Sequence, residues 1–357
     1  MAITRLKLSG TPYEMGKQHG KAFRDQIRAY TAERVHLSGT SSWAGRELSR
    51  RDVLALAEDM VEANEGYEPD LMEEIRGIAD VTNLTPAELL ITNGFTDFID
   101  AVYTRATASA ITHGVDDCTA FLIPGEGTAD GHGFIGQTWD MHASAEPYVL
   151  LTEVTPDDGI PFIGFTTMGC IGQMGMNAEG IAVGINNIMG TGQVGVIWNL
   201  VVRKILAQDN IEDALACITD AELAGAHNYL IMDKHGSGYN VEAMAGRYHV
   251  EELNDDPIVH TNHCVIDHNR EVERERPPES KISSVHRLNQ GMKLLEERPI
   301  TEETLFALTR DETAICVRPK PPLYSASLGA TVMRPGTREF WAVQGSPRDN
   351  EYERFVL

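Results

Sequence analysis

The stretch GVDDCTAFLIP, residues 114–124, marks the point where the character of the chain changes. A turn containing glycine leads to Cys118, and the apolar run from Ala120 to Ile123 then ends at Pro124. Short apolar runs bounded by turn residues are typical of strands, so Cys118 is predicted to start a strand. A cysteine in this position is more often a buried structural residue than a reactive one. Other motifs must therefore decide whether it carries chemistry.

The chain before this point is predicted to be helical from residue 12 to about residue 110. Pro12 suits a first helical turn, and TPAE at residues 85–88 combines a capping box with proline at the first helical position. The chain after it is predicted to form short strands from Ala120 to Ile185, where glycine is frequent and apolar runs alternate with turns. This order of elements favours an α+β fold with an N-terminal helical segment.

The remaining elements alternate between helices and strands. Helices are expected at 198–207, 211–218, 283–296 and 302–309, and strands at 229–233, 239–243, 258–261, 329–333 and 340–343. The intervening stretch DHNREVERERPPES, residues 267–280, is highly charged and contains two prolines, so it is predicted to be a solvated loop. The strands are expected to form two stacked sheets.

Composition narrows the class of protein. The 357 residues carry a formal net charge of -23, and 42% of them are hydrophobic, which is enough for a sizeable core. No basic cluster is large enough for a nucleic-acid interface, and no apolar run approaches the ~18 residues of a membrane helix. The N-terminus lacks the apolar run of a secretory signal, so we expect a cytoplasmic protein that binds neither nucleic acid nor membrane.

The cysteines give little evidence of metal or disulfide chemistry. There are five, widely spaced, and no two of them form a CxxC pair. In a chain without a secretory signal, reduced and mostly buried thiols are expected. One or two of them at most need a chemical role.

Several motifs together resemble a known family. They are GTPYEMGKQHG at 10–20, Cys118-Thr119, TWD at 138–140, the turn from Asn177 that leads to Asn186, HTNHC at 260–264, and GAT at 329–331. In order and spacing they are similar to the acyl-CoA:6-aminopenicillanic acid acyltransferase family and, more distantly, to the choloylglycine hydrolases. The resemblance spans nearly the whole chain. It implies a four-layer αββα sandwich of the N-terminal-nucleophile (Ntn) hydrolase type.

The resemblance also implies a mechanism. The precursor would cut itself between Asp117 and Cys118, and residues 1–117 and 118–357 would stay associated as a small and a large chain. The new α-amine of Cys118 would be the general base for its own thiol, which is chemically reasonable because an α-amine titrates near 7.7–8.0 and a thiol near 8.5. The thiolate would attack a small amide and form an acyl-enzyme that water or an amine resolves. No cofactor and no metal are implied.

The matching positions imply individual roles. Asp140 would hold the α-amine, Asn262 would donate to the tetrahedral oxyanion, and Asn186 is the second oxyanion candidate. Thr119, Ser327 and Leu328 are expected to line the substrate site.

Two positions depart from the family. Asp117 stands where glycine often precedes the nucleophile, which could alter the speed of self-cleavage. Leu328 stands where the penicillin-forming members have arginine, so a substrate carboxylate bound at that place is in doubt.

Alternatives remain open at this point. His260 and His263 could serve a metal-dependent amidase, and a cysteine hydrolase of another type or a non-catalytic small-molecule-binding protein would also fit a soluble α+β chain. The expected partner is a small-molecule amide substrate: an N-acyl amine or N-acyl amino acid. A homo-oligomer is left open by the sequence.

Overall fold

The N-terminal part of the chain is a helical layer preceded by one strand. The computed structural model describes residues 2–105, 118–320 and 324–357. The elements in order are β1 (Arg5–Gly10), α1 (Pro12–Ala22), α2 (Arg24–Ser38), α3 (Ser41–Ala44), α4 (Arg50–Tyr67), α5 (Pro69–Thr82), α6 (Pro86–Asn93) and α7 (Phe95–Thr104). The predicted helices and the capping box at Thr85 and Glu88 are confirmed. The strand β1 was not predicted, although polar and apolar residues alternate along it and Leu8 is buried.

The strands form two sheets. Sheet A has the order β1-β4-β5-β6-β7-β8-β9-β10, and sheet B has the order β11-β2-β3-β12-β13-β14. The bounds in sheet A are β4 (Val149–Pro156), β5 (Phe162–Thr167), β6 (Met174–Asn177), β7 (Ala182–Asn187), β8 (His227–Met232), β9 (Gly238–Met244) and β10 (Arg247–Glu252). Those in sheet B are β2 (Ala120–Ile123), β3 (Phe134–His142), β11 (Ile258–His260), β12 (Ser325–Arg334), β13 (Glu339–Gln344) and β14 (Glu353–Val356).

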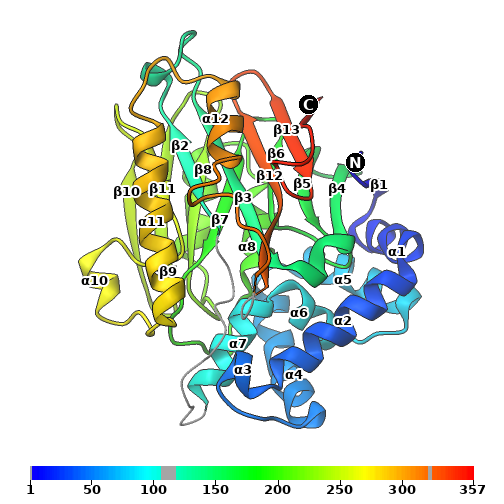
Figure 1. Cartoon of the computed structure of the whole chain (residues 1–357). Helices are drawn as coiled ribbons and strands as arrows, with labels where there is room; N and C mark the ends of the chain where they lie inside the picture. Colours follow the sequence, from blue (N-terminus) through cyan, green and yellow to red (C-terminus); the bar gives the residue numbers. More distant parts are fainter. Residues whose placement is uncertain (1, 106–117, 321–323) are drawn as a thin grey trace.

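The later helices lie on the outer faces of the sheets (Figure 1). They are α8 (Trp198–Ile205), α9 (Ile211–Thr219), α10 (Asp267–Arg270), α11 (Pro278–Leu294) and α12 (Glu302–Thr309), with 3₁₀ turns η1 (Gly125–Gly127) and η2 (Ala143–Tyr148). No helix in the described ranges is both long and apolar enough to span a membrane.

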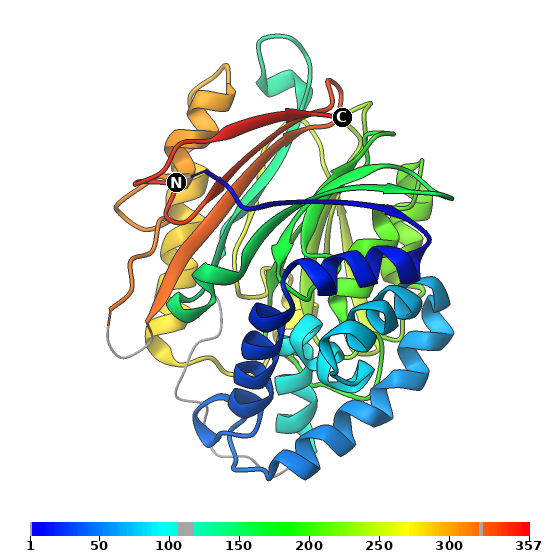
Figure 2. The same ribbon diagram turned by 90° about the vertical axis from the view of Figure 1, so that its right-hand side faces the viewer.

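Successive side chains along a strand point to opposite faces of the sheet, so each sheet packs against the other sheet on one face and against helices on the other. In β8, Leu230 and Met232 pack between the two sheets, whereas Tyr229 and Ile231 pack against helices. On the far side of sheet B, Phe121 packs into the cluster that contains residues of α12. Figure 2 shows α11 and α12 (yellow to orange), the two sheets, and the N-terminal helices (blue to cyan) beneath them. The predicted four-layer αββα sandwich is confirmed.

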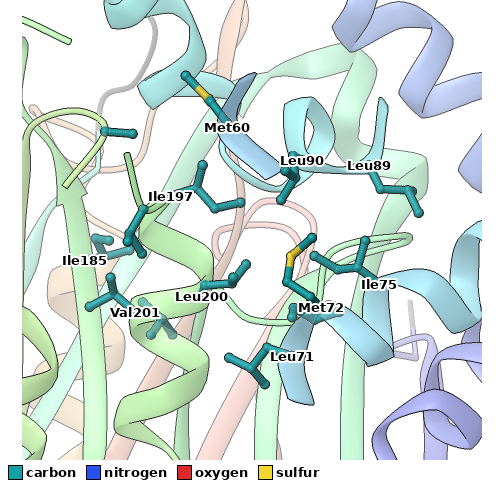
Figure 3. Close-up of a cluster of buried hydrophobic side chains, with 14 of the residues drawn as sticks. Met60, Leu71, Met72, Ile75, Leu89, Leu90, Ile185, Ile197, Leu200 and Val201 are labelled. Carbon is teal, nitrogen blue, oxygen red and sulfur yellow. The ribbon is translucent and has the colours of Figure 1, made fainter. Parts of the chain in front are cut away.

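A continuous apolar core joins the N-terminal helices to sheet A. Met60 of α4, Met72 of α5 and Leu90 of α6 meet Leu200 of α8 and Ile185 of β7 (Figure 3). Each of these side chains is almost fully buried, and burial of such a side chain stabilises the fold by about 1.5–3 kcal/mol. The N-terminal segment is therefore packed into the sandwich rather than attached to its surface.

The prediction of a solvated loop at residues 267–280 is wrong in part. The stretch contains α10 and the first turn of α11, and its side chains Arg274 and Arg276 are largely buried. Arg274 pairs with Asp100 of α7 at 2.7 Å. The high charge density predicted that these side chains would be exposed. Arg274 is buried instead, because its charge is paired with the buried carboxylate of Asp100.

Candidate active site

Cys118 lies two positions before β2, which begins later than predicted, and it is buried between the sheets. Its side chain is 3% exposed and belongs to the cluster that includes Trp139 and Met141. The backbone N–H of Asp140 donates to the Cys118 sulfur at 3.4 Å, and the thiol lies 3.7 Å from the Asp140 carbonyl oxygen. The adjoining Asp117, predicted to precede the cut, lies outside the described residues.

Asp140 lies in β3, beside the predicted nucleophile. It is fully buried, and Oγ1 of Thr138 donates to its Oδ2 at 3.3 Å. The same Oγ1 accepts the N–H of Thr119 at 3.1 Å. One hydroxyl thus connects the Asp140 carboxylate to the backbone directly after Cys118. The carboxylate therefore lies on β3, the neighbour of β2, beside the residues that precede β2.

Asn262 comes to the same place from the strand on the other side of β2. It follows β11, which pairs with β2 through His260 and Ala120. Its Nδ2 donates to the Asn187 carbonyl at 3.0 Å, and its backbone N–H donates to Ser284 Oγ at 2.9 Å. These contacts fix a buried amide whose N–H groups lie on the side of β7.

Arg287 was not predicted as a site residue, yet it joins the others. Its Nη1 donates to the Cys118 carbonyl oxygen and, at 3.2 Å, to Thr119 Oγ1. Its Nη2 donates to Asn262 Oδ1 at 2.9 Å. The side chain is fully buried. A single guanidinium therefore connects the predicted nucleophile to the predicted oxyanion donor.

A sequence signal for Arg287 existed in α11. The buried face of that helix consists of Ser280, Ser284, Arg287 and Gly291. Small residues at helical spacing allow close approach to a sheet, and a Cβ at Gly291 would lie 2.9 Å from Val259. An arginine inside such a stripe points at the sheet rather than at solvent.

Asn186 occupies the face of β7 that looks toward sheet B. Gly184, two positions earlier on the same face, lies so close to sheet B that a Cβ there would meet Oε1 of Gln137. The Gln137 side chain bridges the two sheets, because its Oε1 accepts the N–H of Ile185 and its Nε2 donates to the Ile185 carbonyl oxygen. Asn186 is opposite Asn228 in β8, and both are fully buried. Within the part of the chain that the structure describes, neither amide has a hydrogen-bond partner. Buried amides are normally paired, so this pair is open to a ligand or water.

The three predicted substrate residues are buried near Cys118. Thr119 is held by Arg287 and Thr138, as described above. Ser327 lies opposite Asp140 in the pairing of β12 with β3, and its Oγ accepts the N–H of Val317 at 2.9 Å. Leu328 packs in the cluster between the sheets that also contains Cys118.

The two histidines considered for metal binding have other partners. His260 Nε2 lies 3.0 Å from Glu242 Oε1, and His263 Nδ1 lies 2.7 Å from Ser284 Oγ. Burial lowers the pKa of His263 to about 4, with a smaller effect of neighbouring cationic groups. Among the described residues, no group of three or more His, Cys, Asp or Glu side chains could hold a metal ion.

The other four cysteines are poor nucleophiles. Burial raises the pKa of the Cys170 thiol to about 11 and that of Cys217 to about 12, and it also raises the pKa values of Cys264 and Cys316. A thiol with a raised pKa carries little thiolate at neutral pH. These residues therefore fit structural positions.

Two cavities are lined by neighbours of the site residues, although neither lining includes Cys118, Asp140 or Asn262 themselves. A small one of about 30 Å³ lies under the N-terminal helices and is lined by Trp139, Met141 and Tyr30. A larger one of about 720 Å³ lies between α11 and residues 312–320. Its wall includes Ser283, one helical turn before Arg287, and Val317, which is bonded to Ser327. The larger cavity can hold a small molecule; the smaller one has room for about one water.

The larger cavity is lined by basic side chains from the C-terminal part of the chain, whereas residues 118–202 contain no Lys or Arg. Arg318 and Lys320 line it, and Arg318 pairs with Asp349 at 2.7 Å. Arg334, another arginine near the end of the chain, lies at the far end of β12. It lies seven positions after Ser327 in the strand, which is roughly 23 Å at the usual rise.

A family model described as acyl-coenzyme A:6-aminopenicillanic acid acyl-transferase matches residues 127–349. The match includes Asp140, Asn186 and Asn262 and begins after Cys118. Over 309 residues the chain is 26% identical to the acyl-coenzyme A:6-aminopenicillanic-acid-acyltransferase 40 kDa form of Emericella nidulans, covering 85% of this chain and 80% of that protein.

Other similar proteins are more distant or less informative. An uncharacterized protein of Archaeoglobus fulgidus is 27% identical over 70% of this chain and 45% of its own length. A crystal structure of a conjugated bile acid hydrolase variant from Clostridium perfringens aligns with a TM-score of 0.46 and 12% identity, over 67% of this chain and 97% of that one. Penicillin V acylase from Agrobacterium tumefaciens aligns with a TM-score of 0.35 and 12% identity, over 69% and 80%.

Proposed function

Because this chain belongs to the acyl-coenzyme A:6-aminopenicillanic acid acyltransferase family, we propose that it is a self-cleaving Ntn enzyme whose nucleophile is Cys118. The observation that carries the proposal is the meeting of Cys118, Asp140 and Asn262 at one end of three adjacent strands. The substrate is proposed to be a small N-acyl amine or N-acyl amino acid, held in the cavity beside α11.

Self-cleavage would precede turnover. The Cys118 sulfur attacks the carbonyl carbon of Asp117, and the bond to the Cys118 nitrogen breaks as the acyl group moves to sulfur. Water then hydrolyses the thioester, which leaves a carboxylate on Asp117 and a free α-amine and thiol on Cys118. Residues 1–117 and 118–357 would remain associated, since the N-terminal helices share their core with sheet A.

Turnover would repeat the same chemistry on the substrate. The α-amine of Cys118 accepts the thiol proton, and the sulfur attacks the amide carbon. Asn262 and Asn186 are the proposed donors to the oxyanion, and Asp140 orients the α-ammonium by a charge-assisted hydrogen bond. The ammonium returns its proton to the leaving amine. Water resolves the acyl-enzyme to a carboxylic acid, or an acceptor amine resolves it to a new amide.

The proposal is tested by replacing one cysteine at a time. Cys118→Ala is expected to abolish both self-cleavage and turnover, whereas Cys170→Ala, which removes another buried thiol, should keep the chemistry. Turnover is measured on matched amides that share one acyl group and differ in the amine, such as an amino acid and its decarboxylated form. Full amidase activity in Cys118→Ala would refute the nucleophile assignment, and the panel identifies the preferred amine.

A further inference from the structure

We propose that Arg287 is a positioning residue that holds Cys118 and Asn262 together and keeps the α-amine of Cys118 in its neutral form. The inference rests on the proposed function, because it concerns the same nucleophile. It goes beyond it by assigning a role to a residue of α11 that lies outside the motifs of strands β2, β3 and β11.

The contacts of Arg287 place it between two groups that must act together. Nη1 binds the Cys118 carbonyl oxygen and Thr119 Oγ1, and Nη2 binds Asn262 Oδ1 at 2.9 Å. The Cys118 carbonyl survives self-cleavage, because the bond that breaks is on the other side of the residue. Arg287 can therefore hold the nucleophile in both the precursor and the mature enzyme.

The contact with Asn262 determines which way its amide points. An amide side chain can present either oxygen or nitrogen to a given neighbour, and arginine has only donors. With Oδ1 bound to Arg287, Nδ2 must face away from α11, where it bonds the Asn187 carbonyl and has a second N–H. An oxyanion needs a donor, so Arg287 selects the orientation in which Asn262 can serve.

The contact with Cys118 has an electrostatic consequence. A guanidinium bonded to the Cys118 carbonyl lies within roughly 6 Å of the α-nitrogen of the same residue. At that separation a fixed positive charge opposes protonation of the amine, while the Asp140 carboxylate favours it. The general base must be neutral to accept the thiol proton. Arg287 therefore offsets Asp140 and extends the active form of the amine to lower pH.

Other charged and titratable groups also surround this end of the sandwich. In the described part of the chain they are Asp140 of β3, His263 and Arg276 between β11 and α11, Cys316 before β12, and Tyr30 and Arg34 of α2. Arg287 is distinguished from them by its hydrogen bond to the backbone carbonyl of Cys118 itself. A change in its charge should therefore act most directly on the amine.

The test separates charge from hydrogen bonding at position 287. Arg287→Lys keeps the charge and a donor, Arg287→Gln keeps a donor without the charge, and Arg287→Met removes both. The control is Arg203→Gln, which removes another buried arginine, paired with Glu74 at 3.4 Å on the other side of sheet A. Self-cleavage is followed over time, and alkylation of Cys118 by iodoacetamide is followed against pH in the cleaved enzyme.

The expected result is graded. The acid limb of the alkylation profile should stay in place in Arg287→Lys and in the control, and move up by about one pH unit or more in Arg287→Gln and Arg287→Met. Self-cleavage should be slowest in Arg287→Met. If Arg287→Met does not fold, the comparison of Lys with Gln still decides the role of the charge.

Two results would overturn the inference. Equal acid limbs and cleavage rates in Arg287→Lys and Arg287→Gln would exclude the electrostatic role, and wild-type behaviour in all three variants would exclude the positioning role. Failure of the proposed function gives a different outcome, because the wild-type protein would then yield no chain that begins at Cys118.

Discussion

Two segments of the chain contribute to the site in opposite ways. Residues 118–202 contain no Lys or Arg and supply Cys118 and Asp140 from buried strands. Residues 267–290 are highly charged and supply Arg287, with Arg274 and Arg276 buried nearby. The comparison teaches that the proposed reactive groups and the buried arginines come from different parts of the sequence, which meet only in the fold.

Arginine suits this second segment because its guanidinium can be buried with several acceptors. Arg274 pairs with Asp100 and lies 4.1 Å over the ring of Tyr103. Arg276 donates to the Asn187 carbonyl at 3.0 Å. By contrast, Arg270 of the same segment is half exposed and pairs with the almost fully exposed Asp267. The segment thus has a buried set and a solvated set of arginines.

The largest effect should come from breaking the buried set. Arg274→Met leaves Asp100 buried without its cation, and loss of one partner of a buried pair typically costs about 3–5 kcal/mol. Arg270→Met, the matched control, should cost less than about 1 kcal/mol, because exposed pairs contribute little. Urea unfolding of both variants measures the difference. Similar losses in the two variants would show that the buried and solvated sets are not energetically distinct.

The next effect compares two oxyanion candidates: Asn262, which is bound by Arg287 of the charged segment, and Asn186, which belongs to the segment without Lys or Arg. Asn262→Ala is expected to lower kcat by roughly 10²–10³, the usual cost of one such donor. Asn186→Ala, from the segment without Lys or Arg, should have a comparable effect if both amides face the oxyanion. Binding of a non-reactive substrate analogue should hardly change in either variant. An unchanged kcat in one of them would remove that residue from the site.

The smallest effect concerns acid stability next to the buried arginines. His263 has a pKa lowered to about 4 by burial and, to a smaller degree, by His260 and Arg276. Above about pH 6.5 it is neutral in both the folded and the unfolded chain. As pH falls toward 4, the unfolded chain takes up a proton that the folded chain resists, so stability is lost in that window.

His263→Gln should remove this loss. Between pH 7 and pH 5, the wild type is expected to lose about 1–2 kcal/mol more than His263→Gln, whereas His249→Gln on the exposed strand β10 should behave like the wild type. Urea unfolding at the two pH values provides the measurement. Equal pH dependence in all three proteins would mean that His263 is not held neutral.

Local signals predicted much of the fold. Proline and threonine at helix starts placed α1 and α6, and alternation of apolar runs with turns placed β2, β5 and β7. The positions named for Cys118, Asp140 and Asn262 come together at one end of sheet B. These residues could be named from the sequence because each belongs to a short motif that resembles the family.

The rest depends on contacts between segments that are far apart in the sequence. Arg287 is 169 positions from Cys118, and its helix has a buried face of small polar residues rather than an apolar stripe. The charge density of residues 267–280 predicted that they would be exposed. Arg274 and Arg276 are buried instead, because they pair with Asp100 of α7 and with the Asn187 carbonyl oxygen, respectively. The edge strands β1 and β14 were missed because each buries a single residue and neither contains an apolar run.

The most direct test of the central claim is the N-terminal sequence of the purified, active protein. The account predicts two associated chains that separate on a denaturing gel, with the larger one beginning Cys-Thr-Ala-Phe at Cys118. The Cys118→Ala protein, prepared in parallel, should remain one intact chain. Active enzyme that consists of a single uncut chain, or a new N-terminus at any other residue, would contradict the account.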